Sequence, residues 1–202
     1  MHTVIPYAAP AGPHCQAALA DLTLPNLAQL LGLLQPTPPV LGSAESLTPL
    51  GERVQAKSLG LQGADGLVPW AALDAEHLGL TKLHGSSGWA WITPCHWRIG
   101  ADHVLMEDPQ SLNLSAHDSD ALRSAMQPYF AEDGITLHPL NTSTWLAQGA
   151  ALADLPTASL ARTRGARVDG WMPRQEQAQP LRRLQNEMQM LLYTCLLYTS
   201  DA

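Results

Sequence analysis

The sequence predicts an α/β fold in which a small α+β unit is inserted into a larger, incomplete core. Three observations lead to this prediction: leucines at helical spacing before residue 84, aromatic and β-branched residues after residue 88, and helical spacing again from Pro180. The Gly85-Ser86-Ser87-Gly88 stretch is a flexible joint between the first two patterns. We therefore expect a core segment at 1–84, an insert at 85–148 and a returning segment at 149–194.

The core segment is expected to begin with a strand at 3–7 and to continue with helices. One helix is predicted at 16–22. Pro25 opens the next helix, because proline fits a first helical turn, and the leucines of that helix share one face. These leucines are Leu27, Leu30, Leu31 and Leu34, and prolines from Pro36 onward must end the helix.

Two further helices are predicted before the joint. Thr48 is the expected N-cap of the first, with Pro49 in its first turn and Gly60 near its end. Asp65-Gly66 indicates a turn, and another short helix opens at Pro69.

The insert is predicted to have the order β-β-α-β-β. Strands are expected at 89–93, over 97–106 with a break at Gly100, at 135–137 and at 144–146. Ser115 and Asp118 resemble a capping box, and Gly134 suits the helix end. The expected buried helix face is Leu122, Met126, Tyr129 and Phe130, and the expected shared sheet face is Trp89, Trp91 and Trp97.

Composition restricts the class of protein. Only 14% of residues are charged and the formal net charge is −7, which argues against a general nucleic-acid binder, because phosphate neutralisation needs clustered Lys and Arg. Three separated cysteines with no CxxC pair argue against a thiolate zinc site and suit a reducing compartment. No stretch has the character of a signal peptide or a membrane span, so we expect a cytoplasmic protein.

More than half of the 11 Lys and Arg residues lie between positions 162 and 183. This stretch is either a solvated, Arg-rich surface or a docking strip for an anion such as a phosphorylated ligand. Two of the arginines open the last helix, where a cation opposes the macrodipole, which suggests that an acidic partner or a phosphate neutralises them. The candidate ligand-binding residues are Arg162, Arg164, Arg167, Arg182 and Arg183.

Two other groups suggest chemistry less strongly. Cys95-His96 resembles a nucleophile pair, but neighbours on a strand point to opposite faces, so a packed, hydrogen-bonded histidine is the preferred interpretation. Asp102-His103 with Asp108 is a possible metal set, although an Asp-Pro pair is also an ordinary turn start. We therefore expect no catalytic residue and no metal ligand in this chain.

The last eight residues, 195–202, match the translation of a transposon-end adapter used in DNA libraries, which encodes Cys-Leu-Leu-Tyr-Thr-Ser-Asp-Ala in one frame. The alternative is an ordinary C-terminal strand. We expect the natural sequence to diverge after Thr194, and Cys195 enters no chemical argument.

Four blocks resemble, in order, a betaproteobacterial family labelled phosphoglycerate-mutase-like, or regulatory protein of the RpfE type. They are Thr93-Pro94-Cys95-His96-Trp97, the stretches 102–109 and 155–160, and the stretch 181–194, which contains Leu-Gln-Asn-Glu-Met-Gln-Met-Leu-Leu-Tyr. In that family a His-Pro-Val-Asn block and a Val-Asn-Ser-Phe-Trp block come next. The resemblance therefore implies a chain that stops before its fold is complete.

A more distant similarity is to archaeal-type cofactor-independent phosphoglycerate mutases of the alkaline-phosphatase superfamily. It rests on Leu24-Pro25-Asn26-Leu27 and on residues 59–72, which precede the inserted domain in those enzymes. The similarity implies an alkaline-phosphatase-like core, a serine phosphoryl carrier near Ser43 or Ser46, and two divalent metals bound by Asp and His. The stretch Ile5-Pro6-Tyr7-Ala8-Ala9 has no carboxylate where the first metal ligand is expected.

Three functional hypotheses follow. The leading one is a non-catalytic or regulatory relative of the phosphoglycerate mutases that binds a phosphorylated small molecule and uses no cofactor in this chain. The second is an active mutase or phosphatase that depends on manganese or magnesium, with most ligands outside these residues. The third is an interaction module that presents the tryptophan-bearing sheet to an unidentified protein.

Overall fold

The computed structural model describes residues 5, 12–36, 38, 41–80 and 88–199, with side chains as far as residue 192. The strand expected at 3–7 lies, apart from Ile5, outside the described residues, as does most of the joint at 85–88. The described part combines helices with two small antiparallel sheets, which confirms a mixed helix–sheet fold. Neither sheet in this part is parallel, so the described residues show no parallel core.

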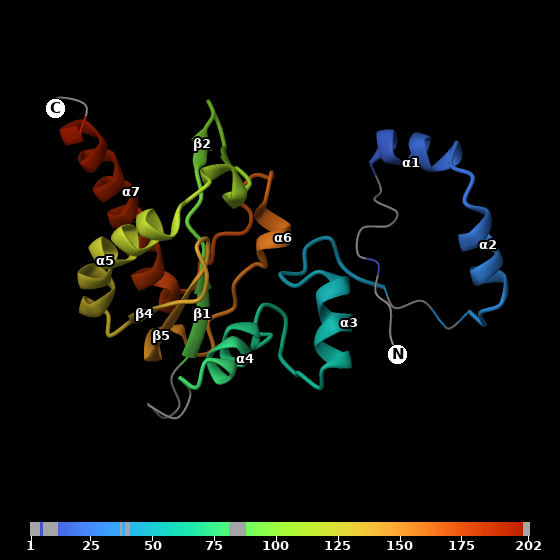
Figure 1. Cartoon of the computed structure of the whole chain (residues 1–202), viewed down its shortest axis with the longest axis horizontal. Helices are drawn as coiled ribbons and strands as arrows, with labels where there is room; N and C mark the ends of the chain where they lie inside the picture. The colour runs from blue at the N-terminus through green and yellow to red at the C-terminus, as the bar shows by residue number, and fades with distance from the viewer. Residues whose placement is uncertain (1–4, 6–11, 37, 39–40, 81–87, 200–202) are drawn as a thin grey trace.

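Short helices occupy the first part of the chain where the sequence predicted them. α1 spans Pro13–Ala20 and α2 spans Pro25–Gly32, each with its proline in the first turn. α3 spans Leu50–Ser58 and α4 spans Trp70–His77. Figure 1 shows α1 and α2 standing apart from the rest of the molecule, whereas α4 lies against the sheet.

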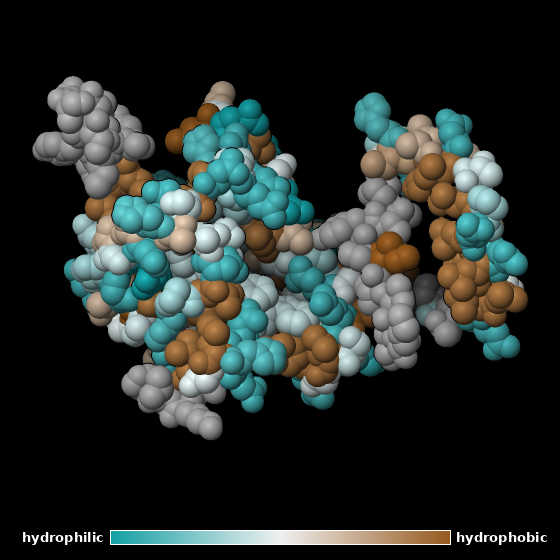
Figure 2. Space-filling model, viewed as in Figure 1, coloured by the Kyte–Doolittle hydropathy of each residue, from teal (hydrophilic) through white to brown (hydrophobic). Residues whose placement is uncertain are grey.

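The leucine face of α2 is exposed to solvent. Neither α1 nor α2 buries a residue. The exposed fractions are 39% for Leu27, 54% for Leu30, and 57% for both Leu31 and Leu34. Figure 2 shows this face as hydrophobic surface over α2. An amphipathic helix normally buries such a stripe, so this one has no cover among the described residues.

Thr48 does not cap α3, contrary to the prediction. Pro49 is the N-cap residue, and no side chain bonds to the start of that helix. The Thr48 hydroxyl instead accepts the Gly66 N–H at 2.9 Å. The Asp65 carboxylate in turn accepts the N–H groups of Leu47 and Thr48, each at 2.8 Å. The start of α3 is therefore tied to the predicted Asp-Gly turn.

The larger sheet has three antiparallel strands. β1 spans Gly88–Ile92, β4 spans Thr136–Pro139 and β5 spans Trp145–Gly149. The order is β1-β5-β4, so the last strand in sequence occupies the centre. In the β1–β5 register, Trp91 lies opposite Leu146.

The region 97–106 forms a separate two-stranded sheet rather than one broken strand. β2 spans Trp97–Ile99 and β3 spans Val104–Met106, with a turn at Gly100 where the prediction placed a break. Trp97 consequently lies in a different sheet from Trp89 and Trp91. The prediction that all three tryptophans share one sheet face is wrong, because β2 pairs with β3 and not with the sheet that contains β1.

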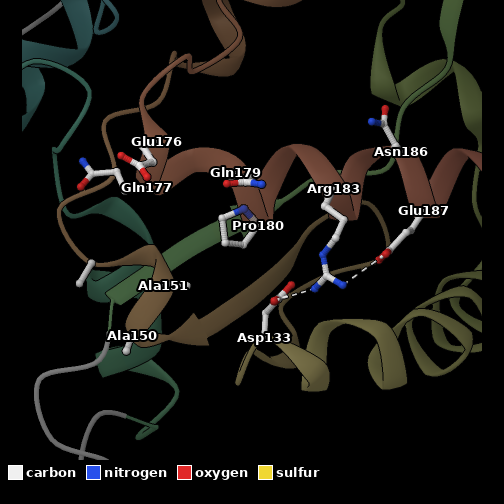
Figure 3. Close-up of a pocket in the computed structure, with 11 residues that line it drawn as sticks. Asp133, Ala150, Ala151, Glu176, Gln177, Gln179, Pro180, Arg183, Asn186 and Glu187 are labelled. Carbon is white, nitrogen blue, oxygen red and sulfur yellow. Dashed lines mark hydrogen bonds and ion pairs between the residues drawn. The ribbon is translucent and has the colours of Figure 1, made fainter.

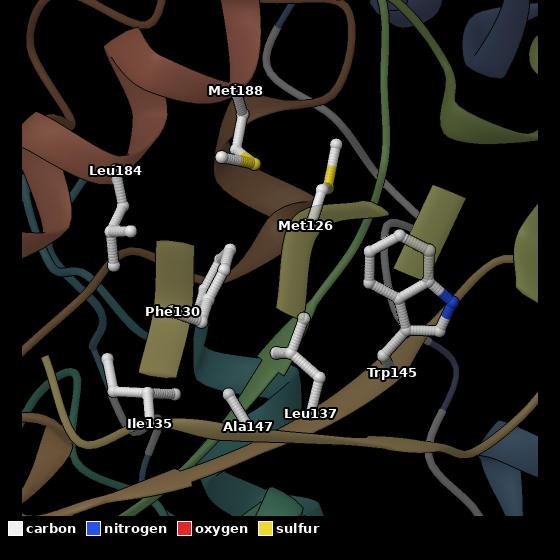
Figure 4. Packing of buried hydrophobic residues seen from close by; sticks show 8 residues of the cluster. All are labelled: Met126, Phe130, Ile135, Leu137, Trp145, Ala147, Leu184 and Met188. Carbon is white, nitrogen blue, oxygen red and sulfur yellow. The ribbon is translucent and has the colours of Figure 1, made fainter. Parts of the chain in front are cut away.

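Two helices cover one face of the larger sheet. α5 spans Ala116–Glu132 and begins with the predicted capping box of Ser115 and Asp118. Gly134, at φ +68°, follows its end as expected. α7 spans Gln179–Thr199 and continues through the expected boundary after residue 194. Figure 4 shows the buried cluster that these helices form with the sheet: Met126, Phe130, Ile135, Leu137, Trp145, Ala147, Leu184 and Met188.

The other face of the sheet is covered by α4. Ala71 and Ala75 of α4 pack with Leu146 of β5, and Trp89 packs against this cluster. The Trp91 indole N–H donates to an Asp74 carboxylate oxygen at 2.9 Å. The fold around the sheet therefore has three layers, and α4 covers the face that carries Trp89 and Trp91.

Short elements complete the chain: η1 Pro109–Leu112, η2 Ala150–Leu152, α6 Leu160–Thr163 and η3 Glu176–Ala178. The returning segment contacts the chain near α3, because the Ser159 N–H donates to the Leu47 carbonyl at 3.0 Å. Its helix α7 also completes the core of the expected insert, so packing crosses the boundary placed at 148. Among the described helices, none has both the length and the apolar character that crossing a membrane requires.

Candidate functional site

The structure distributes the predicted arginines over three places instead of one strip. Arg162 lies near α3, Arg182 and Arg183 lie at the start of α7, and Arg164 and Arg167 lie beside the β2–β3 hairpin. The partners of each group determine which of these guanidinium groups can accept an outside ligand.

Arg162 holds the returning segment against the loop before α3. Its guanidinium donates to the Ser43 carbonyl at 3.0 Å and to the Ser46 hydroxyl at 2.9 Å. The same group lies over the Trp171 ring, 5.7 Å from its centroid. Nearby, the Ser159 hydroxyl donates to the Glu52 carboxylate. These bonds use Arg162 as an internal link.

The phosphoryl-carrier candidates take part in the same link. Ser46 is 9% exposed, and its hydroxyl lies 2.9 Å from the Ser43 carbonyl and 3.1 Å from the Thr48 carbonyl. Because it also accepts from Arg162, both its donor and its acceptor roles are filled. The Ser43 hydroxyl accepts the Glu45 N–H at 3.1 Å. Both serines stabilise a loop in this arrangement.

Arg182 and Arg183 both have partners within the chain, Arg182 in backbone carbonyls and Arg183 in carboxylates. Arg182 donates to the carbonyls of Pro173 and Gln175, at 2.8 and 3.1 Å, in the loop before α7. Arg183 donates to Asp133 at 2.7 Å and lies 3.5 Å from Glu187, as Figure 3 shows. The Asp133 carboxylate, through its hydrogen bond and its charge, raises the pKa of Arg183. The acidic partner that the sequence suggested is therefore the end of α5.

An open hollow lies beside Arg183. Its lining includes three carboxylates with this one arginine, together with amides and small alanines. Figure 3 shows Arg183 between Asp133 and Glu187, with Glu176 further along the lining. Because Arg183 is already bonded to Asp133 and paired with Glu187, this hollow offers no available guanidinium group to a phosphorylated ligand.

Arg164 and Arg167 are brought to the β2–β3 hairpin by backbone pairing. Leu105 forms an antiparallel bridge with Arg167, and Met106 forms a parallel bridge with Arg164. The Gly165 N–H donates to the Met106 carbonyl at 2.8 Å. On the other side of β3, Arg98 is the register partner of Leu105. Arg98 and Arg167 therefore flank Leu105 on the same face of the hairpin.

The ion pairs of these arginines are long and exposed. Arg98 lies 3.6 Å from Glu107, Arg164 lies 3.7 Å from Asp108, and Arg167 lies 3.9 Å from a carboxylate oxygen of Asp102 and 3.4 Å from Asp169. Arg167 also donates to the Asp102 carbonyl at 3.1 Å. The side chains of the three arginines are 64%, 53% and 56% exposed, in the same order. We call the following nine residues the hairpin charge cluster: His96, Arg98, Asp102, His103, Glu107, Asp108, Arg164, Arg167 and Asp169.

Both histidines of this cluster pair with its carboxylates. His96 Nδ1 lies 3.1 Å from Glu107, and His103 Nδ1 lies 2.6 Å from Asp102. The hydrogen bond and charge of His103, together with Arg167, hold the pKa of Asp102 below its usual range. His96 is 60% exposed, so the prediction that it is packed is wrong, whereas the predicted hydrogen bond is present, to Glu107. Its strand ends in the exposed hairpin rather than in the core.

The remaining candidates from the sequence, Cys95 and Asp108, do not have the surroundings of reactive groups. Burial raises the pKa of the Cys95 thiol, although a hydrogen bond with Trp97 opposes the rise, and a raised pKa disfavours the nucleophilic thiolate. The Asp108 side chain accepts the Gln110 N–H at 3.1 Å and so caps η1. In the part of the chain that the structure describes, no three His, Cys, Asp or Glu side chains gather as metal ligands would.

Sequence reasoning missed Arg98, because its place in the cluster depends on a strand pairing that spacing did not reveal. A signal was present in the two-residue spacing of Arg98 in β2 and His96 just before it, which in an extended chain puts both on one side. Comparison of the chain with protein-family models, curated proteins and solved structures gives no match.

Proposed function

We propose that this chain is a non-catalytic, phosphoglycerate-mutase-like protein that binds a phosphorylated metabolite at the hairpin charge cluster. The observation that supports this most is the difference between the two kinds of arginine contact. Arg162, Arg182 and Arg183 each make internal hydrogen bonds of 3.0 Å or less. The charged partners of Arg98, Arg164 and Arg167 lie at 3.4–3.9 Å, and Arg167 also donates to the Asp102 carbonyl at 3.1 Å.

This difference matters because an incoming anion competes with the existing partners. Exposed ion pairs contribute about 0–1 kcal/mol, so their displacement costs little. A phosphate offers several oxygens and forms shorter, charge-assisted bonds, often two to one guanidinium. Arg164 and Arg167 thus remain the preferred ligand residues from the sequence, and Arg98 joins them. Arg182 is interpreted as a structural residue that stabilises the loop before α7.

The proposal of a non-catalytic role rests on the state of the candidate nucleophiles. The Ser46 hydroxyl is fully hydrogen-bonded, and the Cys95 thiol has a raised pKa. The surface expected for an interaction module is reduced, because α4 covers Trp89 while Trp91 stays 46% exposed. These observations favour binding over chemistry.

We also propose that the described helices belong to an incomplete α/β core of the alkaline-phosphatase type. Two observations support this: residues near Ser159 return to the start of α3 after the sheet, and the leucine face of α2 lies open as if a sheet were to cover it. A cytoplasmic location is part of the proposal, and the free thiols of Cys15 and Cys95 are compatible with it.

Calorimetric titration with 3-phosphoglycerate and 2-phosphoglycerate tests the function, beside a coupled mutase assay with manganese or magnesium. We expect binding without turnover. Arg98→Ala and Arg167→Ala should each weaken binding, on the order of tenfold for a lost charge-assisted contact. Arg123→Ala is the matched control, because Arg123 pairs with Asp120 on α5. Turnover that a chelator abolishes would instead establish the metal-dependent enzyme. Equal losses of binding affinity in all three variants would show that the ligand does not bind at the hairpin charge cluster.

A further inference from the structure

We infer that protonation of His96 and His103 strengthens the binding of an anion at the hairpin charge cluster. This inference rests on the proposed function and specifies how the same site is regulated. It concerns two side chains that neither the fold nor the binding proposal has used.

The geometry repeats at two places. The Glu107 carboxylate lies between His96 Nδ1, at 3.1 Å from one oxygen, and Arg98 Nε, at 3.6 Å from the other. The Asp102 carboxylate lies between His103 Nδ1, at 2.6 Å, and Arg167, at 3.9 Å, again with one oxygen for each partner. In each case a histidine and an arginine share one carboxylate, and the histidine is the nearer partner.

Protonation of the histidine changes which side chain balances the charge of the carboxylate. A neutral histidine leaves the carboxylate charge to the arginine, whereas an imidazolium at these distances forms a charge-assisted hydrogen bond with it. The arginine is then free to turn its N–H groups toward another anion. Histidine is the side chain that ordinarily changes charge between about pH 5 and pH 8, so the exchange is tested in that range.

The net charge of the cluster changes sign in the same step. Its three arginines face four carboxylates, those of Asp102, Glu107, Asp108 and Asp169, so the sum is −1 with neutral histidines. Two protonated histidines bring the sum to +1. Arg174 donates to the Asp169 carbonyl at the edge of the cluster and adds the same charge in both states. The Asp102 carboxylate stays ionised, since its pKa is already held low.

Sulfate is the probe that separates this effect from titration of the ligand, because it stays doubly charged where a phosphate monoester does not. Its affinity for the whole chain is measured by calorimetry from about pH 5.5 to about pH 8, the range in which histidine changes charge, at constant ionic strength. We expect sulfate to bind on the order of tenfold more tightly at the acidic end, since two positive charges are added beside the carboxylates that the arginines share.

The variants assign the effect to its residues. His96→Gln with His103→Gln keeps the arginines and should make sulfate affinity independent of pH. His117→Gln is the control, because His117 lies on α5 beside Asp118 and is 93% exposed. Sulfate binding that is equal at all pH values overturns this inference and leaves the proposed function standing. A pH dependence that survives in the double variant also overturns the inference, whereas absence of binding at every pH overturns both.

Discussion

The Trp145 indole N–H donates a hydrogen bond of 2.9 Å to the hydroxyl of Ser119, and both residues are buried. Trp145 begins the central strand of the larger sheet, and Ser119 lies in the first turns of α5. The bond therefore fixes the position of the helix along the strand. It also gives the largest buried side chain of the core a partner for its single polar atom.

Ser119→Ala should destabilise the protein by about 1–3 kcal/mol, the usual penalty for a buried donor left without an acceptor. The free energy of unfolding in urea measures the effect. Ser124→Ala, on an exposed position of the same helix, should change it by no more than about 0.5 kcal/mol. If the two variants are equally stable, the Trp145 N–H has another partner and its bond to Ser119 does not contribute to the free energy of unfolding.

Leu184→Ala should destabilise the protein by about 2–5 kcal/mol, because it opens a cavity where α7 packs on the sheet. Leu184 is 1% exposed, whereas Met190 on the same helix is 63% exposed. Met190→Ala is therefore the control, with an expected change within about 0.5 kcal/mol. A mild effect of Leu184→Ala would mean that α7 is not part of this core.

Asp65 should make stability fall in acid. Burial opposes its ionisation, but the N–H groups of Thr48 and Leu47 hold its pKa below the ordinary 3.8. A lowered folded-state pKa means that the contribution is present above pH 3.8 and is lost as the pH falls through the folded-state value. The stability difference between wild type and Asp65→Ala should therefore shrink below about pH 4. Glu76→Ala, on the exposed side of α4, should show no such convergence.

The open leucine face of α2 should make the isolated chain self-associate. Exposed apolar stripes of this kind promote association, and few charges nearby oppose it. Light scattering after size exclusion should show species larger than a monomer that grow with concentration. Leu27→Lys with Leu31→Lys should reduce them, while Lys57→Ala on α3 should not. A wild-type chain that is monomeric and unfolds in one cooperative transition would contradict both this prediction and the proposed incomplete core.

Local patterns predicted the elements that depend on neighbouring residues. The capping box at Ser115 follows from side chains three residues apart, and the buried face with Met126 and Phe130 follows from helical spacing. Thr48 also has a good local reason to cap α3, but a stronger partner is supplied by Gly66, eighteen positions away. Capping propensity could not predict this hydrogen bond, because it forms only when the turn at Asp65 folds back onto Thr48.

The candidate site was predicted only in part for the same reason. Arg164 and Arg167 were identified from their density along the sequence, which does not depend on folding. Their separation from Arg162 and Arg183 could not be foreseen, because it arises when residues 164–167 pair with β3 and the start of α7 reaches the end of α5. The exposure of His96 likewise depends on the hairpin turn.

The central position of β5 determines when the sheet can form during synthesis. β1 ends at Ile92 and β4 ends at Pro139, yet the two do not pair with each other and must wait for the strand that begins at Trp145. The cluster beneath the sheet waits longer, until Leu184 and Met188 leave the ribosome. Such non-local closure is slow and leaves hydrophobic strands uncovered meanwhile. A nascent chain of this protein is therefore expected to depend on chaperones until α7 has been made.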